Sequence, residues 1–146
     1  MVYKTLGIIT VCVLFFSPLN VYSSSIKEDY ELQKKCEKQS EEIFKEQYGY
    51  DNVKVNTING FDLYTHRTHY NKIFNICFQL IEKNLCKEDG VVETRIKELL
   101  DVNENTKYGS IMEFLNTRKI WECFVAQKTC KSAGEWDLLI KLYMEE

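Results

Sequence analysis

The sequence predicts an α+β domain in which a small antiparallel sheet of three or four strands lies between an N-terminal and a C-terminal helix. Two stretches, one near each end, combine helical spacing of apolar residues with capping residues. The middle of the chain is instead rich in β-branched and aromatic residues, which favour strands. This order is typical of a fold whose helices cover one face of an antiparallel sheet.

The first predicted helix runs from Ser25 to Tyr48. Ser25 and Glu28 form a capping-box pattern, no proline or glycine interrupts the stretch, and Gly49 supplies a stop. The positions expected on its inward face are Leu32, Cys36, Ser40, Ile43 and Phe44. The opposite face carries lysines and glutamates, so it faces solvent. Cys36 therefore points inward, where a disulfide would attach this helix to the rest of the fold.

The middle of the chain contains one clear strand and two ambiguous segments. Residues 61–70 are rich in strand formers, whereas 51–60 reads as a polar connection. Residues 72–82 fit both a strand and a helix, and we favour a strand because of their aromatic and β-branched content. Residues 91–100 fit both patterns equally well, so they stay open between strand and helix.

The C-terminal part predicts a strand followed by a helix. Residues 118–125 resemble a strand with Trp121, Cys123 and Val125 on one side. Ser132 is expected to cap the final helix, with Glu135 as its capping-box partner. The apolar stripe of this helix is expected to be Trp136, Leu139, Ile140 and Tyr143.

The first 23 residues have the order of a secretory signal peptide. Lys4 precedes an apolar run over residues 6–16, and small residues follow up to Ser23. The run is too short to cross a bilayer, which takes roughly 20 apolar residues. We therefore expect cleavage after Ser23, a single globular domain over 24–146, and a secreted or periplasmic location.

Charge and hydropathy limit the partners of the mature chain. Removing the signal leaves 18 basic and 22 acidic residues, with no basic patch among aromatic residues, so we expect no nucleic-acid partner. No later segment is apolar enough to span a membrane, and Cys12 lies inside the apolar run rather than at the cleavage point of a lipoprotein. We expect a soluble mature protein.

Export changes how the cysteines are interpreted. Five would remain after cleavage: Cys36, Cys77, Cys86, Cys123 and Cys130. In an oxidising compartment cysteines are first candidates for disulfides, but spacing alone does not fix their connectivity. An odd number leaves at least one thiol unpaired or joined to another chain. Cys123 and Cys130 lack the Cys-x-x-Cys spacing of redox motifs, and a tight hairpin would bring them within disulfide range.

Few residues are candidates for catalysis or metal binding. His66 and His69 are the only histidines, and Asp62 is the nearest carboxylate, so an exported hydrolase using these three residues is one hypothesis. A zinc site would need the two histidines and Cys86 to converge. Cys86, near Lys83 and Lys87, is also a candidate nucleophile if a histidine lies close in space. Surface or hydrogen-bonding roles explain all of these residues without catalysis, and we expect neither a metal nor a cofactor.

The order of several short motifs resembles a group of small exported bacterial proteins of uncharacterised function. The motifs are Cys36-Glu-Lys-Gln39, His69-Tyr-Asn, Asn75-Ile-Cys77-Phe78, Asp101-Val-Asn-Glu-Asn105, Cys130-Lys-Ser132 and Glu135-Trp-Asp137. The resemblance covers nearly all of the mature chain and implies bacterial origin and a strand at 73–81. Against that pattern Cys86 is extra, which implies the pairs Cys36–Cys77 and Cys123–Cys130 with Cys86 free.

The sequence thus predicts a non-enzymatic exported domain that binds a partner protein, an envelope component or a small ligand. The basis is the absence of any complete catalytic or phosphate-binding motif, together with a disulfide framework suited to an exported protein. The alternative is the hydrolase that uses His66 or His69 with Asp62.

Overall fold

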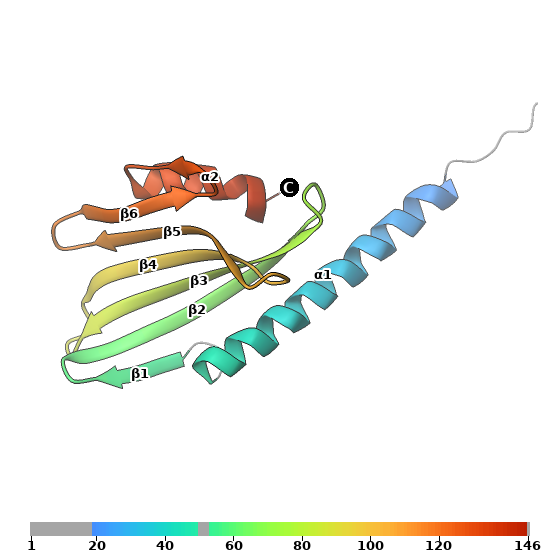
Figure 1. Cartoon of the computed structure of the whole chain (residues 1–146). Helices are drawn as coiled ribbons and strands as arrows, with labels where there is room; N and C mark the ends of the chain where they lie inside the picture. The colour runs from blue at the N-terminus through green and yellow to red at the C-terminus, as the bar shows by residue number, and fades with distance from the viewer. Residues whose placement is uncertain (1–18, 50–52, 146) are drawn as a thin grey trace, which may run out of the picture.

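A seven-stranded antiparallel sheet flanked by two helices forms the domain (Figure 1). The computed structural model describes residues 19–49 and 53–145. Neighbours in the chain are neighbours in the sheet, from β1 at one edge to β7 at the other. The elements are α1 (Leu19–Tyr48), β1 (Val53–Thr57), β2 (Gly60–Asn71), β3 (Ile76–Lys87), β4 (Val92–Asp101), β5 (Thr106–Phe114), β6 (Lys119–Val125), β7 (Lys128–Thr129) and α2 (Ala133–Met144).

The prediction of three or four strands is wrong, because three further strands complete the sheet. β1 lies in the stretch expected to be a polar connection, and it forms by pairing along one edge of β2. β5 contains Gly109 and Ser110, which have low strand propensity, yet it pairs with β4 on one side and β6 on the other. The two residues of β7 pair only with the end of β6. Backbone pairing across the sheet therefore decides these strands, rather than local composition.

Both ambiguous segments form strands. β3 covers most of 72–82, but the first four residues of that segment, up to Asn75, form the turn of the β2–β3 hairpin. β4 occupies 92–101, the segment that the sequence left open. Its alternating side chains meet those of β3 and β5 in one continuous register, apart from bulges near Cys86 and Leu100.

The two helices cover opposite faces of the sheet, which corrects the expectation that they share one face. Successive residues of a strand point to opposite faces. Near the end of β2 the Thr68 hydroxyl donates to the Ser40 hydroxyl of α1, at 2.6 Å. The Asn71 side chain, an odd number of positions further on, donates instead to the Leu142 carbonyl of α2, at 2.9 Å. One face of the sheet is therefore covered by α1 over β2 and β3, and the other by α2.

Helix α1 uses the predicted inward stripe but begins earlier than predicted. Cys36, Ser40 and Phe44 are buried, and the helix ends before Gly49, whose φ of 99° marks a glycine stop. Ser25 lies inside the helix rather than at its cap. The apolar part of the predicted signal lies outside the described residues, whereas the expected cleavage point after Ser23 lies within α1. None of the helices in the described part of the chain is both long and apolar enough to cross a membrane.

Helix α2 closes the main hydrophobic core on the other face. Ser132 caps the helix as predicted, since its hydroxyl accepts from the Glu135 N–H at 3.1 Å, while the Glu135 carboxylate accepts from the Lys131 N–H at 2.7 Å. The buried core members from the sheet and α2 are Phe78, Leu80, Leu99, Ile111, Cys123, Val125, Cys130, Trp136, Ile140 and Met144. Trp121 is 70% exposed rather than aligned with Cys123 and Val125, because a register shift between β5 and β6 falls beside it.

Two disulfides connect the helices and strands. Cys36 of α1 is joined to Cys77 of β3, and Cys123 of β6 is joined to Cys130 just before α2. These are the pairs that the resemblance implied. The thiol of Cys86 in β3 is free and buried.

Removing the Phe44 side chain tests how α1 is attached. Phe44 is fully buried against the sheet, so Phe44→Ala should lower the free energy of unfolding by about 3–5 kcal/mol. Tyr30→Ala on the same helix is the control, because Tyr30 is 63% exposed and its loss should cost less than about 0.5 kcal/mol. Urea unfolding followed by circular dichroism measures both. Equal losses for the two variants would contradict this packing.

Candidate functional site

The structure separates the residues of the hydrolase hypothesis. His66 and Asp62 lie on the α1 side of β2, but four residues of an extended strand place them roughly 13 Å apart along the backbone. His69 differs from His66 by an odd number of positions, so its side chain points to the opposite face. The carboxylate of Asp62 is paired with Lys83 at 2.8 Å. The three residues therefore do not line one cleft.

His66 belongs to a packed polar layer beneath α1. Its ring stacks on Phe44 with centroids 4.1 Å apart, and its Nδ1 atom lies 3.2 Å from the Gln79 amide. Gln79 also donates to the Ser40 carbonyl at 3.1 Å, and the Thr68 hydroxyl donates to the Ser40 hydroxyl at 2.6 Å. These contacts satisfy buried polar groups that would otherwise destabilise the helix–sheet contact. A structural role accounts for His66.

The structure also separates the three residues that a zinc site would need. Cys86 pairs with Phe61 at the far end of β2, five residues from His66 and eight from His69, which is roughly 16 and 26 Å of strand. Among the described residues, no group of three or more His, Cys, Asp or Glu side chains is placed to hold a metal ion. The Cys86 thiol contacts the Asn84 carbonyl at 3.7 Å and has no histidine beside it in the pairing register.

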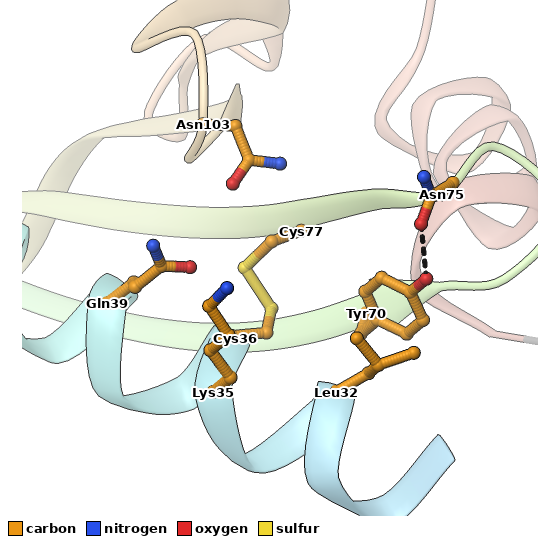
Figure 2. Close-up of a pocket in the computed structure, with 8 residues that line it drawn as sticks. All are labelled: Leu32, Lys35, Cys36, Gln39, Tyr70, Asn75, Cys77 and Asn103. Carbon is orange, nitrogen blue, oxygen red and sulfur yellow. Dashed lines mark hydrogen bonds between the residues drawn. A yellow bond between two sulfur atoms is a disulfide. The ribbon is translucent and has the colours of Figure 1, made fainter. Parts of the chain in front are cut away.

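A cavity of about 190 Å³ surrounds the Cys36–Cys77 disulfide, and we call it the disulfide pocket. Three segments form its walls: one face of α1, the end of the β2–β3 hairpin, and the turn between β4 and β5 (Figure 2). Its lining residues are Leu32, Lys35, Cys36, Gln39, Tyr70, Asn75, Cys77 and Asn103. The four helical residues follow one another at the spacing of a single helix face, which is why they line one wall together.

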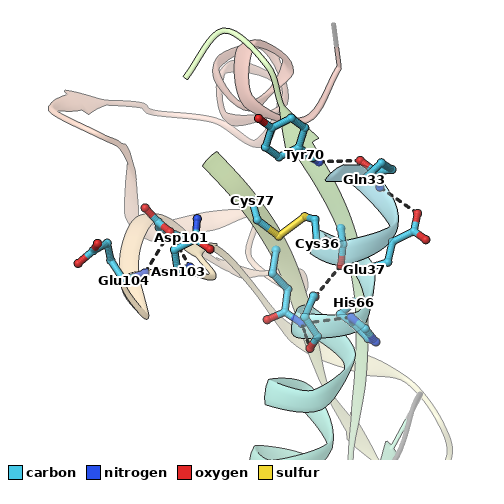
Figure 3. Close-up of a disulfide and its surroundings, with 12 residues drawn as sticks. Gln33, Cys36, Glu37, His66, Tyr70, Cys77, Asp101, Asn103 and Glu104 are labelled. Carbon is cyan, nitrogen blue, oxygen red and sulfur yellow. Dashed lines mark hydrogen bonds between the residues drawn. A yellow bond between two sulfur atoms is a disulfide. The ribbon is translucent and has the colours of Figure 1, made fainter. Parts of the chain in front are cut away.

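Hydrogen bonds fix α1 against the hairpin at the rim of this pocket. Gln33 accepts from the Tyr70 N–H and donates to the Glu37 carboxylate at 2.9 Å (Figure 3). Lys72 in the hairpin turn forms an ion pair with Asp29 of α1 at 2.5 Å. Together with the disulfide, these contacts hold the helix wall and the hairpin wall at a fixed separation.

Two turns supply the remaining amide groups. Asn75 has a φ of 55°, a left-handed conformation that asparagine tolerates better than most residues, and its side-chain oxygen accepts from the Tyr70 hydroxyl at 2.5 Å. In the β4–β5 turn, Asp101 accepts from the N–H groups of Asn103 and Glu104 at 2.8 and 3.2 Å. The Val102 N–H donates to the Cys77 carbonyl at 2.9 Å, which brings this turn over the disulfide.

Several polar side chains of the pocket have no hydrogen-bond or ion-pair partner within the described part of the chain. Within the described part of the chain, no hydrogen bond or ion pair involves the side chains of Lys35, Gln39 and Asn103. Figure 2 shows these three side chains converging around the disulfide. Elsewhere beneath α1 the polar side chains of Ser40 and Gln79 are bonded to one another or to the backbone. Ser40 and Gln79 are buried, whereas Lys35 and Asn103 are exposed and Gln39 is half-buried. The disulfide pocket is the candidate binding site because these accessible polar groups line one cavity.

A second, smaller cavity of about 120 Å³ lies further along the same face of the sheet, between Tyr48, Tyr64, Ile81, Lys83, Ile96 and Glu98. Its charged groups already have partners, since Lys83 pairs with Asp62 and Glu98 pairs with Lys107. Burial alone would lower the pKa of Lys83, but interactions with Asp62 and Tyr64 raise it above its ordinary value. Burial, followed by the charge of Glu98, raises the pKa of Tyr48. This cavity offers a ligand few unsatisfied polar groups.

Sequence reasoning did not identify the disulfide pocket. It placed Cys36 inward and drew attention to Gln39 and Asn75 within the motifs of the resemblance, but it gave none of them a binding role. The available signal was the helical spacing of Leu32, Cys36 and Gln39, continued by Lys35. Asn103 lies within another of those motifs, Asp101-Val-Asn-Glu-Asn105, but no local pattern indicates that its turn lies beside Gln39, 64 positions earlier.

No protein-family model, curated protein or solved structure matches this chain. The resemblance to small exported bacterial proteins therefore stays a prediction.

Removing the disulfide of the pocket should cost more stability than removing the other one. Cys36–Cys77 spans 41 residues and Cys123–Cys130 only 7, so chain entropy predicts losses of about 4 and 2 kcal/mol for the paired Cys→Ser variants. Urea unfolding without reductant measures the difference. Hydrogen exchange in α1 should rise only in the Cys36→Ser, Cys77→Ser variant, and unchanged exchange there would contradict the anchoring role.

Stability should fall at alkaline pH. The pKa values of Tyr48, Lys83 and Tyr143 are raised in the folded state, so the folded protein holds protons that the unfolded chain releases above about pH 10. Their contribution is complete below that pH and is lost as the pH rises. Urea unfolding between pH ~9 and ~11.5, in a Cys86→Ser background that prevents thiol exchange, should show this decline. Tyr48→Phe should flatten the curve, whereas a slope equal to that of the parent would contradict the assignment.

Proposed function

We propose that this chain is an exported, non-enzymatic binding domain and that the disulfide pocket is its site for a small polar ligand. The observation that carries the proposal is the convergence of three unpartnered polar side chains, Lys35, Gln39 and Asn103, in a cavity with rigid walls. Lys35 and Asn103 are exposed and Gln39 is half-buried, so a ligand can reach all three, while the disulfide and the Tyr70–Gln33 hydrogen bond hold the backbone segments that carry the helix and hairpin walls. The cavity of about 190 Å³ is smaller than a drug-sized site, which indicates a ligand of few non-hydrogen atoms.

The residue types in the pocket favour binding over catalysis. Nucleophilic catalysis needs a nucleophile beside a base. Both cysteines in the pocket are held in a disulfide, and its other described lining residues include no histidine, serine, threonine or carboxylate. Amides, an ammonium group and a phenol are instead the groups that orient a bound polar molecule.

Export supports the same proposal. Two disulfides within a short chain are typical of proteins that mature in an oxidising compartment, and the N-terminal pattern is that of a signal peptide. The disulfide that forms the pocket would thus form only after export. The binding site would be complete only in the compartment where the ligand is met.

Amide-resolved NMR tests the proposal on the oxidised protein. Adding the small-molecule extract of the exporting cell should shift the side-chain amide signals of Gln39 and Asn103. Gln39→Met and Asn103→Ala should each weaken binding about five- to tenfold, because each removes hydrogen bonds of roughly 1 kcal/mol.

The matched controls are Gln127→Met and Asn116→Ala, two exposed residues outside the pocket. Both control variants should bind as the parent does. Shifts confined to another part of the molecule, or no shift with any extract, would overturn the proposal.

A further inference from the structure

The hydrogen-bonding groups of the disulfide pocket are strongly biased toward donors. A carboxamide offers two N–H donors and one acceptor oxygen, and a lysine offers three donors and no acceptor. The oxygen of Asn75 already accepts from Tyr70, so Asn75 presents only its amino group to the pocket. Lys35, Gln39, Asn75 and Asn103 together present many donors and only two side-chain oxygens.

The charge of the pocket also favours a ligand with acceptor oxygens. Lys35 is its one charged lining residue among those described, and no carboxylate lines the cavity. Of the acidic side chains on the adjoining segments, Asp101 accepts two turn N–H groups and Glu37 accepts from Gln33. Glu31, one helical turn before Lys35, and Glu104, next to Asn103, are exposed and do not line the pocket. The pocket thus combines one positive charge with an excess of donors, which complements a ligand with one negative charge and several acceptor oxygens.

We propose that the ligand of the disulfide pocket is a small organic carboxylate, held by the Lys35 ammonium and oriented by the amides of Gln39, Asn75 and Asn103. This inference rests on the proposed function and adds the chemical class. A phosphate group is a poorer match, because it carries about 1.5 to 2 negative charges near pH 7 and the pocket supplies one lysine. Phosphate sites also use backbone N–H groups at helix N-termini, whereas the helical lining residues lie in the interior of α1.

The test compares acids with their neutral analogues on the oxidised chain. The probes are lactate against lactamide, glucuronate against glucose, and inorganic phosphate, each titrated by NMR at constant ionic strength. At least one carboxylate should bind about tenfold or more tightly than its neutral partner and than phosphate. Equal binding of acid and neutral partner, or tighter binding of phosphate, would overturn the carboxylate assignment.

Lys35→Gln and Lys34→Gln form a matched pair of variants. Each removes one positive charge from α1, but only Lys35 lines the pocket. Lys35→Gln should abolish the preference for the acid, and Lys34→Gln should retain it. A preference that survives in Lys35→Gln would overturn the role of the ammonium group.

An experiment with the cell extract tests the ligand class separately from the binding function. It also gives a result if none of the five probes binds. The extract is fractionated by anion exchange, and the component that shifts the pocket amides is identified by mass spectrometry. A carboxylic acid supports the inference. A neutral compound or a phosphate ester overturns the class but leaves the binding function intact, whereas no active fraction overturns both.

Discussion

The Cys36–Cys77 disulfide is the contact on which the attachment of α1 and the disulfide pocket depend. It joins the first helix to the third strand across 41 positions of sequence, and it lies where α1 contributes few apolar side chains to the fold. Among the side chains of α1 that the structure describes, Phe44 is the one large apolar residue that is fully buried, whereas the other contacts beneath α1 are mainly hydrogen bonds. Such bonds contribute about 1 kcal/mol each, so a covalent link matters more here than in an apolar interface.

The same disulfide creates the pocket. It holds the helix wall against the hairpin, and the Val102 N–H bond to the Cys77 carbonyl brings the β4–β5 turn to the same place. Three distant segments thereby surround one cavity, and hydrogen bonds between them hold its walls together. Buried polar groups under α1, such as Ser40 and Gln79, are satisfied within the protein, whereas Lys35 and Asn103 are exposed at the pocket and accessible to a ligand.

The position of the helices on opposite faces explains why the histidines do not form a site. His66 faces α1 and contributes to the polar layer with Ser40 and Gln79, whereas His69 points to the face that α2 covers. Their spacing in sequence permitted a shared helix face but not a shared strand face. Once β2 is a strand, its pleat separates them, and this separation counts against the hydrolase hypothesis.

The sequence by itself determined the capped helix at the C-terminus, the inward face of α1 and the strand character of β2, because caps and hydrophobic periodicity act over a few neighbouring residues. The number of strands, the face that each helix covers and the convergence of Lys35, Gln39 and Asn103 were decided only by the tertiary structure. β1 and β5 have weak local signals and form because neighbouring strands pair with them. The pocket depends on contacts between segments far apart in the chain, and no local pattern of residues encodes such contacts.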